Sequence, residues 1–394
     1  MIAKKQGNKI EISFKYDPGL VMLVKSFSGR SYNPKSKSWF IPLAGCLPAI
    51  EKLRKVGFKI DEEIIIFAEH DKKQAEEAVA LAVMDDAVFE TVLPLFPYQK
   101  VGASFLYNIG SGLLGDEMGL GKTIQSLAVC EKTKAQKILV FCPASVKWQW
   151  HDEIKRFIPG AEVCVIEGDK KARDACWTKE ARFYVANYEL LLRDAIMQAI
   201  EWDIVIADEA TKISNPMAKQ SKAIKKLRAK RRIAMTGTPV SNRANEVWNL
   251  VDFISPGALG DYWGFLQRYC LKNQWGGIFG YQNMDELRDK LKRYMIRRLK
   301  KDVLPELPEK IITDIPFEMT EEEKSLYKKI KKEILFEIEK SDISKLEQPM
   351  TVSYTLVKMV RLRQLADSLE LLGENKKSSK LEVLKDLLIN IFEE

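Results

Sequence analysis

Histidine and paired cysteine are scarce in this sequence. Its 394 residues include two histidines and six scattered cysteines, with no Cys-x-x-Cys pair. A structural zinc site needs about four Cys or His ligands at short spacings, and a disulfide framework needs cysteines that can pair. We therefore expect neither kind of site, and a reducing compartment fits this cysteine usage best.

Long apolar runs are also absent. A membrane-spanning helix needs roughly 18 or more consecutive apolar residues, and the sequence has no such run. The first residues, Met1 to Lys5, lack the apolar stretch that a signal peptide requires. The sequence therefore predicts a cytoplasmic protein without a membrane partner.

Acidic residues are missing from one long basic segment. The chain carries a net charge of +8, and residues 212–232 contain nine Lys or Arg and no Asp or Glu. Residues 297–301 form a second basic cluster. A polyanionic partner is compatible with this distribution, but each cluster fits a solvated helix face equally well.

The first part of the chain reads as a small α+β module over residues 1–68. Apolar residues alternate from Lys9 to Tyr16, which is typical of a strand, and Pro18 opens a helical pattern. A second helix is predicted from Cys46 to Val56. Residues 69–92 are rich in Ala, Glu and Asp, and we interpret them as a connecting helix.

The pattern changes at residue 93. Up to residue 312, short apolar runs such as 137–142 and 203–207 alternate with helical stretches. Apolar runs without a period of two suit strands buried on both faces of a parallel sheet. This predicts a doubly wound α/β domain, followed by a helical extension over residues 313–372 and one more helical pattern within 373–394.

The most informative motif runs from Asp116 to Thr123, between a short apolar stretch and a helical pattern. Glycines let the backbone turn its N–H groups inward, and the following helix directs its positive end at an anion. Lys122 can reach the β- and γ-phosphates of a nucleotide, and the Thr123 hydroxyl can bind Mg²⁺. Asp116 stands where the usual phosphate-loop pattern has glycine.

Three further motifs follow or precede this loop. The apolar run 204–207 ends in Asp208 and Glu209, which could hold Mg²⁺ and orient a water molecule, although a surface turn is the alternative. Residues 235–242 hold small hydroxyl residues after another strand. In residues 96–99, Gln99 offers the donor and acceptor that an adenine edge needs, but alone it would be expected to face solvent.

Together these motifs resemble the Swi/Snf group of superfamily-two helicase-like ATPases, which are translocases on double-stranded DNA. The resemblance covers residues 93 to about 372. It rests on six segments: 116–123, 141–149, 208–215, 235–242, 246–250 and 294–308. The sequence departs from the group at Thr211, where relatives often carry His or Gln, so its coupling to DNA is in question.

The resemblance implies a RecA-like fold, ATP and Mg²⁺ as cofactors, and a role for each motif residue. Gln99 would read adenine, Asp208 with Thr123 would hold Mg²⁺, and Glu209 would activate water. The residues implied around the nucleotide are Asp116, Met118, Gly119, Leu120, Gly121, Lys122 and Thr123. The residues implied near the DNA backbone are Ser145, Lys147 and Thr236. For Trp148 and Trp150 we favour packing within the protein over stacking on a base.

Residues 27–39 resemble the HARP module of annealing-helicase relatives, which helps to bind branched DNA. Arg30, Lys35 and Lys37 would contact phosphates beside Tyr32 and Trp39. The alternative is a basic hairpin with a tryptophan in its core. If DNA is the partner, the protein would lie at the nucleoid of a bacterium or phage-infected cell, or in a eukaryotic nucleus.

The family has two RecA-like lobes, and the second supplies arginines that stabilise the γ-phosphate. In this sequence we expect the second lobe to begin at about residue 373 and to be missing beyond it. A fragment, half of a split enzyme completed by another polypeptide, and a degenerate binder would each explain this. The predicted function is an ATP-dependent DNA translocase, and a non-catalytic ATP- and DNA-binding module is the alternative.

Overall fold

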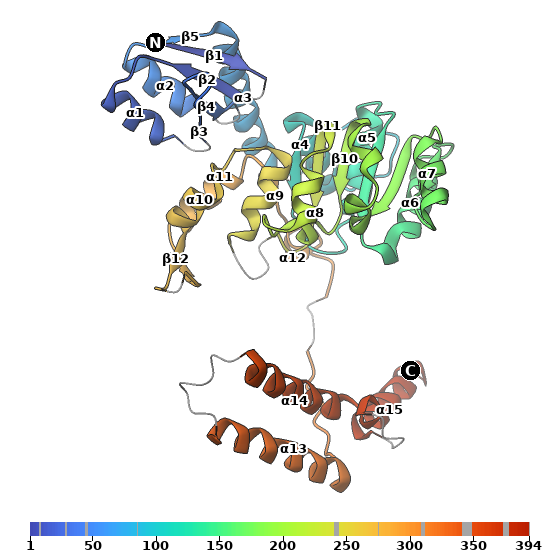
Figure 1. Ribbon diagram of the computed structural model, residues 1–394. Helices are drawn as coiled ribbons and strands as arrows, with labels where there is room; N and C mark the ends of the chain where they lie inside the picture. The colour runs from blue at the N-terminus through green and yellow to red at the C-terminus, as the bar shows by residue number, and fades with distance from the viewer. Residues whose placement is uncertain are drawn as a thin grey trace. The chain divides into compact units, whose positions relative to one another are not determined.

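The computed structural model forms two compact units, residues 1–307 and 308–394, which are described separately (Figure 1). It describes residues 1–7, 9–27, 30–43, 46–84, 86–239, 244–274, 276–308, 312–340, 349–372 and 378–393.

The first unit begins with a five-stranded sheet in the order β3-β4-β2-β1-β5. Its strands are β1 Ile2–Gln6, β2 Lys9–Ser13, β3 Ser31–Asn33, β4 Ser38–Pro42 and β5 Lys59–Ile60. Helices α1 Pro18–Lys25 and α2 Leu47–Lys55 accompany it. The alternation in β2 places Ile10 and Ile12 in a buried core, and Asp17 caps α1 by accepting a hydrogen bond of 2.8 Å from the Leu20 N–H.

Helix α3, Glu62–Ala82, joins this module to the rest of the unit. Our prediction of a helix over 69–92 was wrong at both ends. The helix starts early because Asp61 provides an N-cap. Beyond Ala82 the chain becomes irregular, and side chains there bind the backbone instead: Asp86 accepts from the Ala87 N–H and Thr91 from the Leu93 N–H.

A seven-stranded sheet forms the centre of the unit, in the order β14-β6-β11-β10-β7-β9-β8. All neighbouring strands are parallel. The strands are β6 Gly112–Leu114, β7 Ile138–Cys142, β8 Val163–Val165, β9 Phe183–Asn187, β10 Glu201–Ala207, β11 Arg228–Met235 and β14 Met295–Ile296. The predicted doubly wound α/β fold is confirmed.

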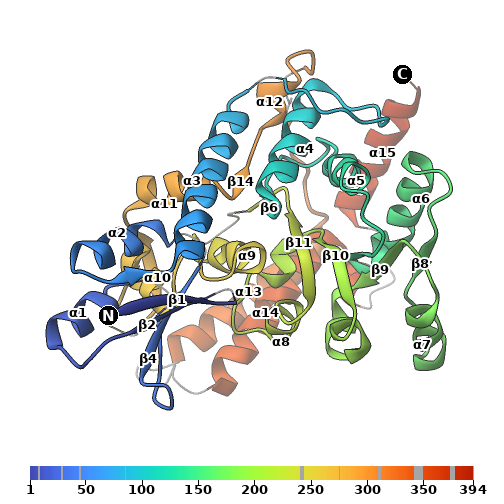
Figure 2. The same cartoon turned by 90° about the horizontal axis from the view of Figure 1, so that it is seen from above.

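The two faces of the sheet carry separate cores. In β10, Val205 and Ala207 join one apolar cluster while Ile204 and Ile206 join the other, because successive strand residues point to opposite faces. One face is covered by α4 Pro97–Ile109, α5 Lys122–Lys132 and α6 Lys147–Phe157. The other is covered by α7 Lys170–Thr178, α8 Lys219–Ile224 and α9 Glu246–Ile254. Figure 2 shows α4 and α5 on one side of the strands and α8 and α9 on the other.

After α9 the chain leaves the sheet and returns to its edge. It forms α10 Tyr262–Tyr269, a hairpin of β12 Cys270–Lys272 and β13 Ile278–Tyr281, and α11 Met284–Leu291. Residues 294–303, which we call the strap, then run beside β6 as β14 and end in α12 Lys300–Val303.

A buried ion pair fastens the strap to the loop after β6. The Asp116 side chain has no exposed surface, and it accepts hydrogen bonds from Arg298 Nε at 3.0 Å, from Arg298 Nη2 at 2.5 Å and from the Arg298 backbone N–H at 3.1 Å. Gln125 Nε2 adds a bond of 3.2 Å. Arg298 also donates to the Tyr98 carbonyl and to Gln125 Oε1. The Asp116–Arg298 pair therefore connects α4, the loop, α5 and the strap.

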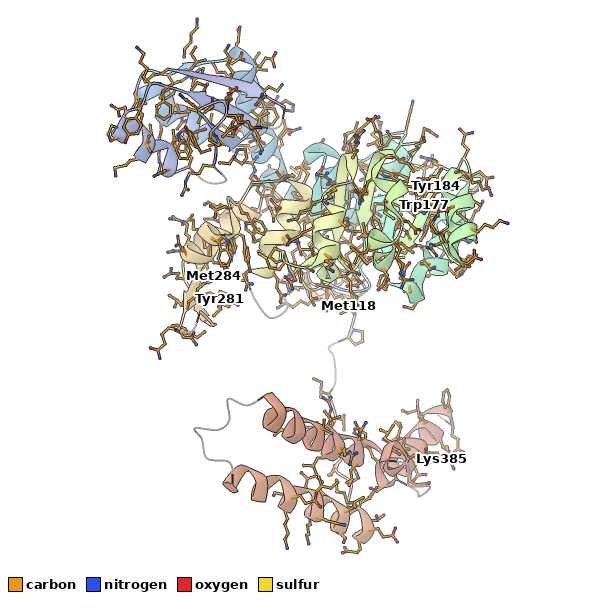
Figure 3. All side chains as sticks on the ribbon, in the orientation of Figure 1. Met118, Trp177, Tyr184, Tyr281, Met284 and Lys385 are labelled. Carbon is orange, nitrogen blue, oxygen red and sulfur yellow. The ribbon has the colours of Figure 1, made fainter. Side chains whose placement is uncertain are left out.

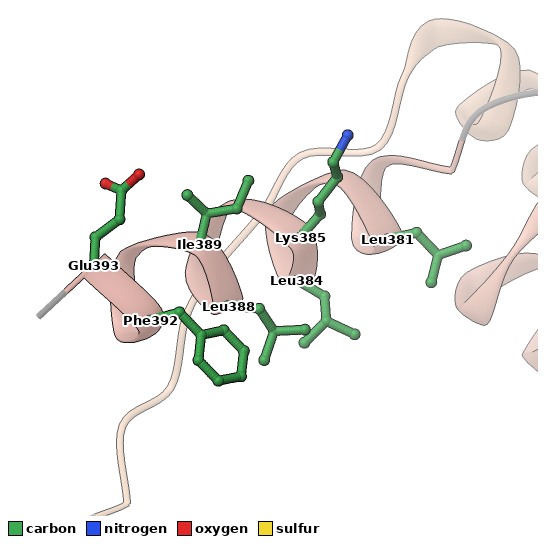
Figure 4. Close-up of a pocket in the computed structure, with 7 residues that line it drawn as sticks. All are labelled: Leu381, Leu384, Lys385, Leu388, Ile389, Phe392 and Glu393. Carbon is green, nitrogen blue, oxygen red and sulfur yellow. The ribbon is translucent and has the colours of Figure 1, made fainter.

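The second unit is helical: α13 Glu321–Lys340, α14 Pro349–Asp367 and α15 Ser379–Glu393. Thr320 and Glu323 form the reciprocal capping bonds of a capping box. Glu323 also accepts from the N–H and hydroxyl of Ser379, at the start of α15. Figure 4 shows the apolar side chains of Leu384, Leu388 and Phe392 along one side of α15. Among the helices that the structure describes, none has the length and apolarity to cross a membrane.

The Asp116–Arg298 pair gives the first testable prediction. Changing Arg298 to Met leaves a buried carboxylate without its cation, so the free energy of unfolding of the first unit should fall by roughly 3–5 kcal/mol. Urea denaturation measures this. The matched control is Arg288→Met, whose partner Asp285 is solvent-exposed, and which should change stability by less than about 1 kcal/mol. Equal effects of the two variants would mean that the buried pair does not hold the strap.

Candidate nucleotide site

The phosphate loop follows β6 and leads into α5. Gly119 and Gly121 adopt φ angles of 82° and 70°, in the left-handed region that favours glycine. A Cβ on Gly121 would lie 2.3 Å from Gln99 Nε2, so a larger residue there would displace the Gln99 amide. Met118 projects from the loop with 60% of its surface exposed (Figure 3), whereas Leu120 is fully buried.

Lys122 begins α5 and folds back over the loop. Its Nζ donates to the carbonyl oxygens of Asp116 at 3.0 Å and Glu117 at 3.3 Å. Burial lowers the pKa of Lys122, and the neighbouring carboxylates of Asp116, Glu209 and Asp208 oppose that effect. The ammonium is therefore held at the loop, in the electric field of the acidic pair.

Asp208 lies at the carboxyl end of β10, on the edge of the sheet where the phosphate loop also begins. Its Oδ2 accepts a hydrogen bond of 2.8 Å from the Trp150 indole, and its Oδ1 accepts from the Glu209 N–H at 3.0 Å. The Tyr188 hydroxyl donates to the Asp208 carbonyl at 2.6 Å. Burial raises the pKa of Asp208, and the Trp150 hydrogen bond opposes the rise.

Glu209 has an unusual backbone for its residue type. Its φ of 47° places a non-glycine residue in the left-handed region, a strained conformation that often occurs at functional sites. Burial raises the pKa of the Glu209 carboxyl, the charge of Asp208 raises it further, and Lys122 lowers it. The structure thus brings Lys122, Asp208 and Glu209 into mutual electrostatic contact.

Gln99 does not face solvent, contrary to the expectation from that residue alone. Only 5% of its surface is exposed, and its Oε1 accepts from the Phe96 N–H at 2.9 Å while its Nε2 donates to the Leu120 carbonyl at 3.3 Å. The amide is buried because it joins the start of α4 to the phosphate loop.

Beside this segment lies a cavity of about 450 Å³. Its lining includes Phe96, Pro97 and Tyr98 from the start of α4, together with Arg298, Val303 and Leu304 from the strap and its continuation. The rings of Phe96 and Tyr98 are parallel, with an interplanar angle of 4°. Aromatic and polar groups therefore surround a space at the start of α4.

The motif at residues 235–242, which follows β11, also reaches the phosphate loop. A Cβ on Gly237 would lie 2.7 Å from Met118 Cγ, so the motif and the loop are in close contact. Thr236 is fully buried, and its Oγ1 accepts from the Thr238 N–H. Residues 240–242 of this motif lie outside the described residues.

The implied DNA contacts divide into exposed and buried residues. Arg30, Lys35, Lys37 and Ser145 are exposed. Lys147 is 8% exposed, because its Nζ donates to the Ile166 carbonyl at 3.1 Å, and Thr236 has no exposed surface. These two residues offer no free side chain to a phosphate, which corrects their assignment as DNA contacts.

The two tryptophans of α6 also differ. Trp150 is 3% exposed and bound to Asp208, as packing within the protein predicts, whereas Trp148 is 53% exposed. Sequence reasoning did not identify the Trp150–Asp208 bond, and the helical spacing of α6 gives no sign of a partner on β10. It also missed the part that Arg298 and Tyr188 play at this site.

The pKa of Glu209 gives a second prediction. A carboxyl whose pKa is raised on folding destabilises the folded state when ionised, and this effect disappears as falling pH protonates it. The variant Glu209→Gln should therefore melt at a higher temperature than the native chain at about pH 8, and the difference should vanish towards about pH 4. Glu201→Gln, at the exposed start of the same strand, should show no such trend. A pH-independent difference for Glu209→Gln would contradict the electrostatic explanation.

Comparison with known proteins places this arrangement in a family. A family model, the SNF2-related domain, matches residues 69–371. The Caenorhabditis elegans SWI/SNF-related matrix-associated actin-dependent regulator of chromatin subfamily A-like protein 1 homolog is 32% identical over 321 residues, covering 77% of this chain and 46% of that protein. The putative ATP-dependent helicase/translocase YwqA of Bacillus subtilis is 34% identical over 254 residues, covering 61% of this chain and 27% of that protein.

A solved structure of the Sulfolobus solfataricus SWI2/SNF2 ATPase core in complex with dsDNA is 29% identical, with a TM-score of 0.49, and covers 79% of this chain and 67% of that one. The present chain spans less than half the length of the two curated relatives above. The matched family region contains the phosphate loop, the acidic pair and the strap. The chain therefore belongs to the SNF2-related family of helicase-like ATPases.

Proposed function

We propose that this chain binds ATP with Mg²⁺ and acts as the ATPase lobe of a double-stranded DNA translocase. The observation that carries the proposal is the meeting of Lys122 with the half-buried acids Asp208 and Glu209 at one sheet edge. A cation on a glycine loop and two adjacent carboxylates are the groups that phosphoryl transfer to water requires.

The residues present fit a magnesium ion. Mg²⁺ prefers oxygen ligands and usually combines one or two protein ligands with phosphate and water oxygens. Asp208 supplies a carboxylate that the Trp150 indole and the Glu209 N–H hold in place, and Thr123 supplies a hydroxyl at the start of α5. When bound, the ion would neutralise charge on the phosphates.

In the same proposal, the cavity beside Gln99 receives the adenine. Its lining by Phe96 and Tyr98 offers apolar contact to a purine ring. Gln99 then acts mainly by holding the start of α4 against the phosphate loop, because both ends of its amide already have partners.

Branched or double-stranded DNA is the proposed partner, and the basic hairpin β3–β4 is one contact. The rings of Tyr32 and Trp39 lie 5.0 Å apart, and Arg30, Lys35 and Lys37 are exposed around them. Lysine and arginine bind phosphates, while an exposed ring such as Tyr32, with 49% of its surface free, can stack on an unpaired base.

Full hydrolysis in this proposal requires a second RecA-like lobe, in the same polypeptide or in a partner. An arginine from such a lobe raises the rate by roughly 10³–10⁵ in comparable enzymes. Helix α15 would be the first helix of that lobe. The apolar side of α15, shown in Figure 4, would pack against the rest of the lobe.

The ATP site is tested with Lys122→Ala. Loss of the ammonium should reduce ATP affinity by at least about tenfold, because a charge-assisted hydrogen bond to phosphate is lost. Calorimetric titration of the 394-residue chain with Mg-ATP measures this. Lys132→Ala, at the other end of α5, is the control and should bind ATP normally. Unchanged ATP affinity in Lys122→Ala would reject the phosphate-loop assignment.

The hairpin is tested by replacing Arg30, Lys35 and Lys37 with Gln. Removing three phosphate contacts should lower affinity for forked DNA and reduce the slope of log affinity against log salt by about 3. Fluorescence anisotropy with forked and plain duplex DNA measures both. Replacing Lys25, Lys52 and Lys55 with Gln, which removes the same charge from the helices of the module, is the control. Equal losses from both triple variants would reject a specific role for the hairpin.

A further inference from the structure

The strap continues the sheet alongside the phosphate loop. Beyond the paired strands, the Gly115 N–H donates to the Ile296 carbonyl at 2.8 Å and the Glu117 N–H donates to the Arg298 carbonyl at 3.0 Å. The Lys300 N–H then donates to Glu117 Oε2 at 2.7 Å. Every second strap residue from 296 to 300 is therefore tied to the loop.

This registration places the Lys300 side chain over the loop. A Cβ on Gly119 would lie 3.2 Å from Lys300 Nζ and 3.3 Å from its Cε. Lys300 is half-buried, whereas the adjacent Lys301 is exposed. Within the described residues, no carboxylate lies within ion-pair distance of Lys300 Nζ. An ammonium without a counter-ion thus lies against the loop that presents its N–H groups to an anion.

From this geometry we propose that Lys300 is a second phosphate-contacting residue, which binds the phosphate chain of the nucleoside triphosphate together with Lys122. The inference rests on the proposed function, since it assumes that ATP occupies this loop. The two lysines come from different parts of the chain. Lys122 starts the helix that follows the loop, whereas Lys300 lies in the strap, 178 residues later in the sequence.

The charge balance supports this assignment. The buried Asp116 carboxylate is already matched by Arg298, and Glu117 Oε2 accepts from the Lys300 backbone rather than from its ammonium. The Lys300 ammonium therefore remains available to a highly charged anion. The strap also lines the cavity beside Phe96 and Tyr98 through Asp302 and Val303, so one segment would contact both the base and the phosphates of one nucleotide.

The test compares Lys300→Gln with Lys301→Gln in the full 394-residue chain. Glutamine keeps the backbone bond to Glu117 and most of the side-chain length, and it removes only the charge. Binding of ATP, ADP and adenosine is measured by calorimetric titration, with thermal melting to check the fold. We expect Lys300→Gln to lower the affinity for ATP about tenfold and the affinity for ADP by less. The affinity for adenosine and the melting temperature should stay unchanged. Lys301→Gln should match the native chain for all three ligands, and Lys300→Arg should retain ATP affinity.

Three results would overturn the proposal. If Lys300→Gln binds ATP as the native chain does while Lys122→Ala does not, the phosphate loop stands and the role of Lys300 fails. If Lys300→Gln lowers the affinities for ATP and adenosine equally, Lys300 supports the structure of the site and does not contact the phosphates. If the native chain binds no ATP, the proposed function fails, and this inference fails with it.

Discussion

Burying a carboxylate is costly unless its charge and its lone pairs find partners, and Asp116 meets this requirement with four hydrogen bonds. Three of the four come from Arg298, which also donates to the Tyr98 carbonyl and to Gln125 Oε1. The position of the nucleotide site depends on this arrangement, because the ion pair joins the start of α4, the phosphate loop and the strap.

The same interaction explains the aspartate at the head of the phosphate loop. A glycine at position 116 would leave the guanidinium of Arg298, only 10% exposed, without a counter-ion. Gly102 is linked to the same requirement, because a Cβ there would meet Gln125 Oε1 at 1.9 Å and Arg298 Nη2 at 2.6 Å. A larger residue at position 102 would therefore displace the Gln125 amide and the Arg298 guanidinium.

The motif residues and the type of sheet could be predicted because both depend on local pattern. Buried parallel strands are apolar throughout, and their carboxyl ends meet at one edge, where Lys122 and Asp208 each follow a strand. The burial of Gln99, Lys147 and Thr236 could not be predicted, since each depends on a partner distant in sequence or on the packing of the sheet edge. The strand β14 has two residues, too few to show an alternating pattern. The first residues of α3 likewise show too little helical periodicity to be recognised.

Helix α3 belongs to two hydrophobic cores at once. Ile64 and Ala68 pack in the core of the N-terminal module, Ala78 packs in the core beside α4, and Asp71 between them is paired with Arg293 at 2.7 Å. A helix of 21 residues is a stiff rod of about 31 Å. Because no loop separates the two cores along this rod, a torque applied at the basic hairpin would reach the ATPase lobe as a tilt of the helix rather than be absorbed by a hinge.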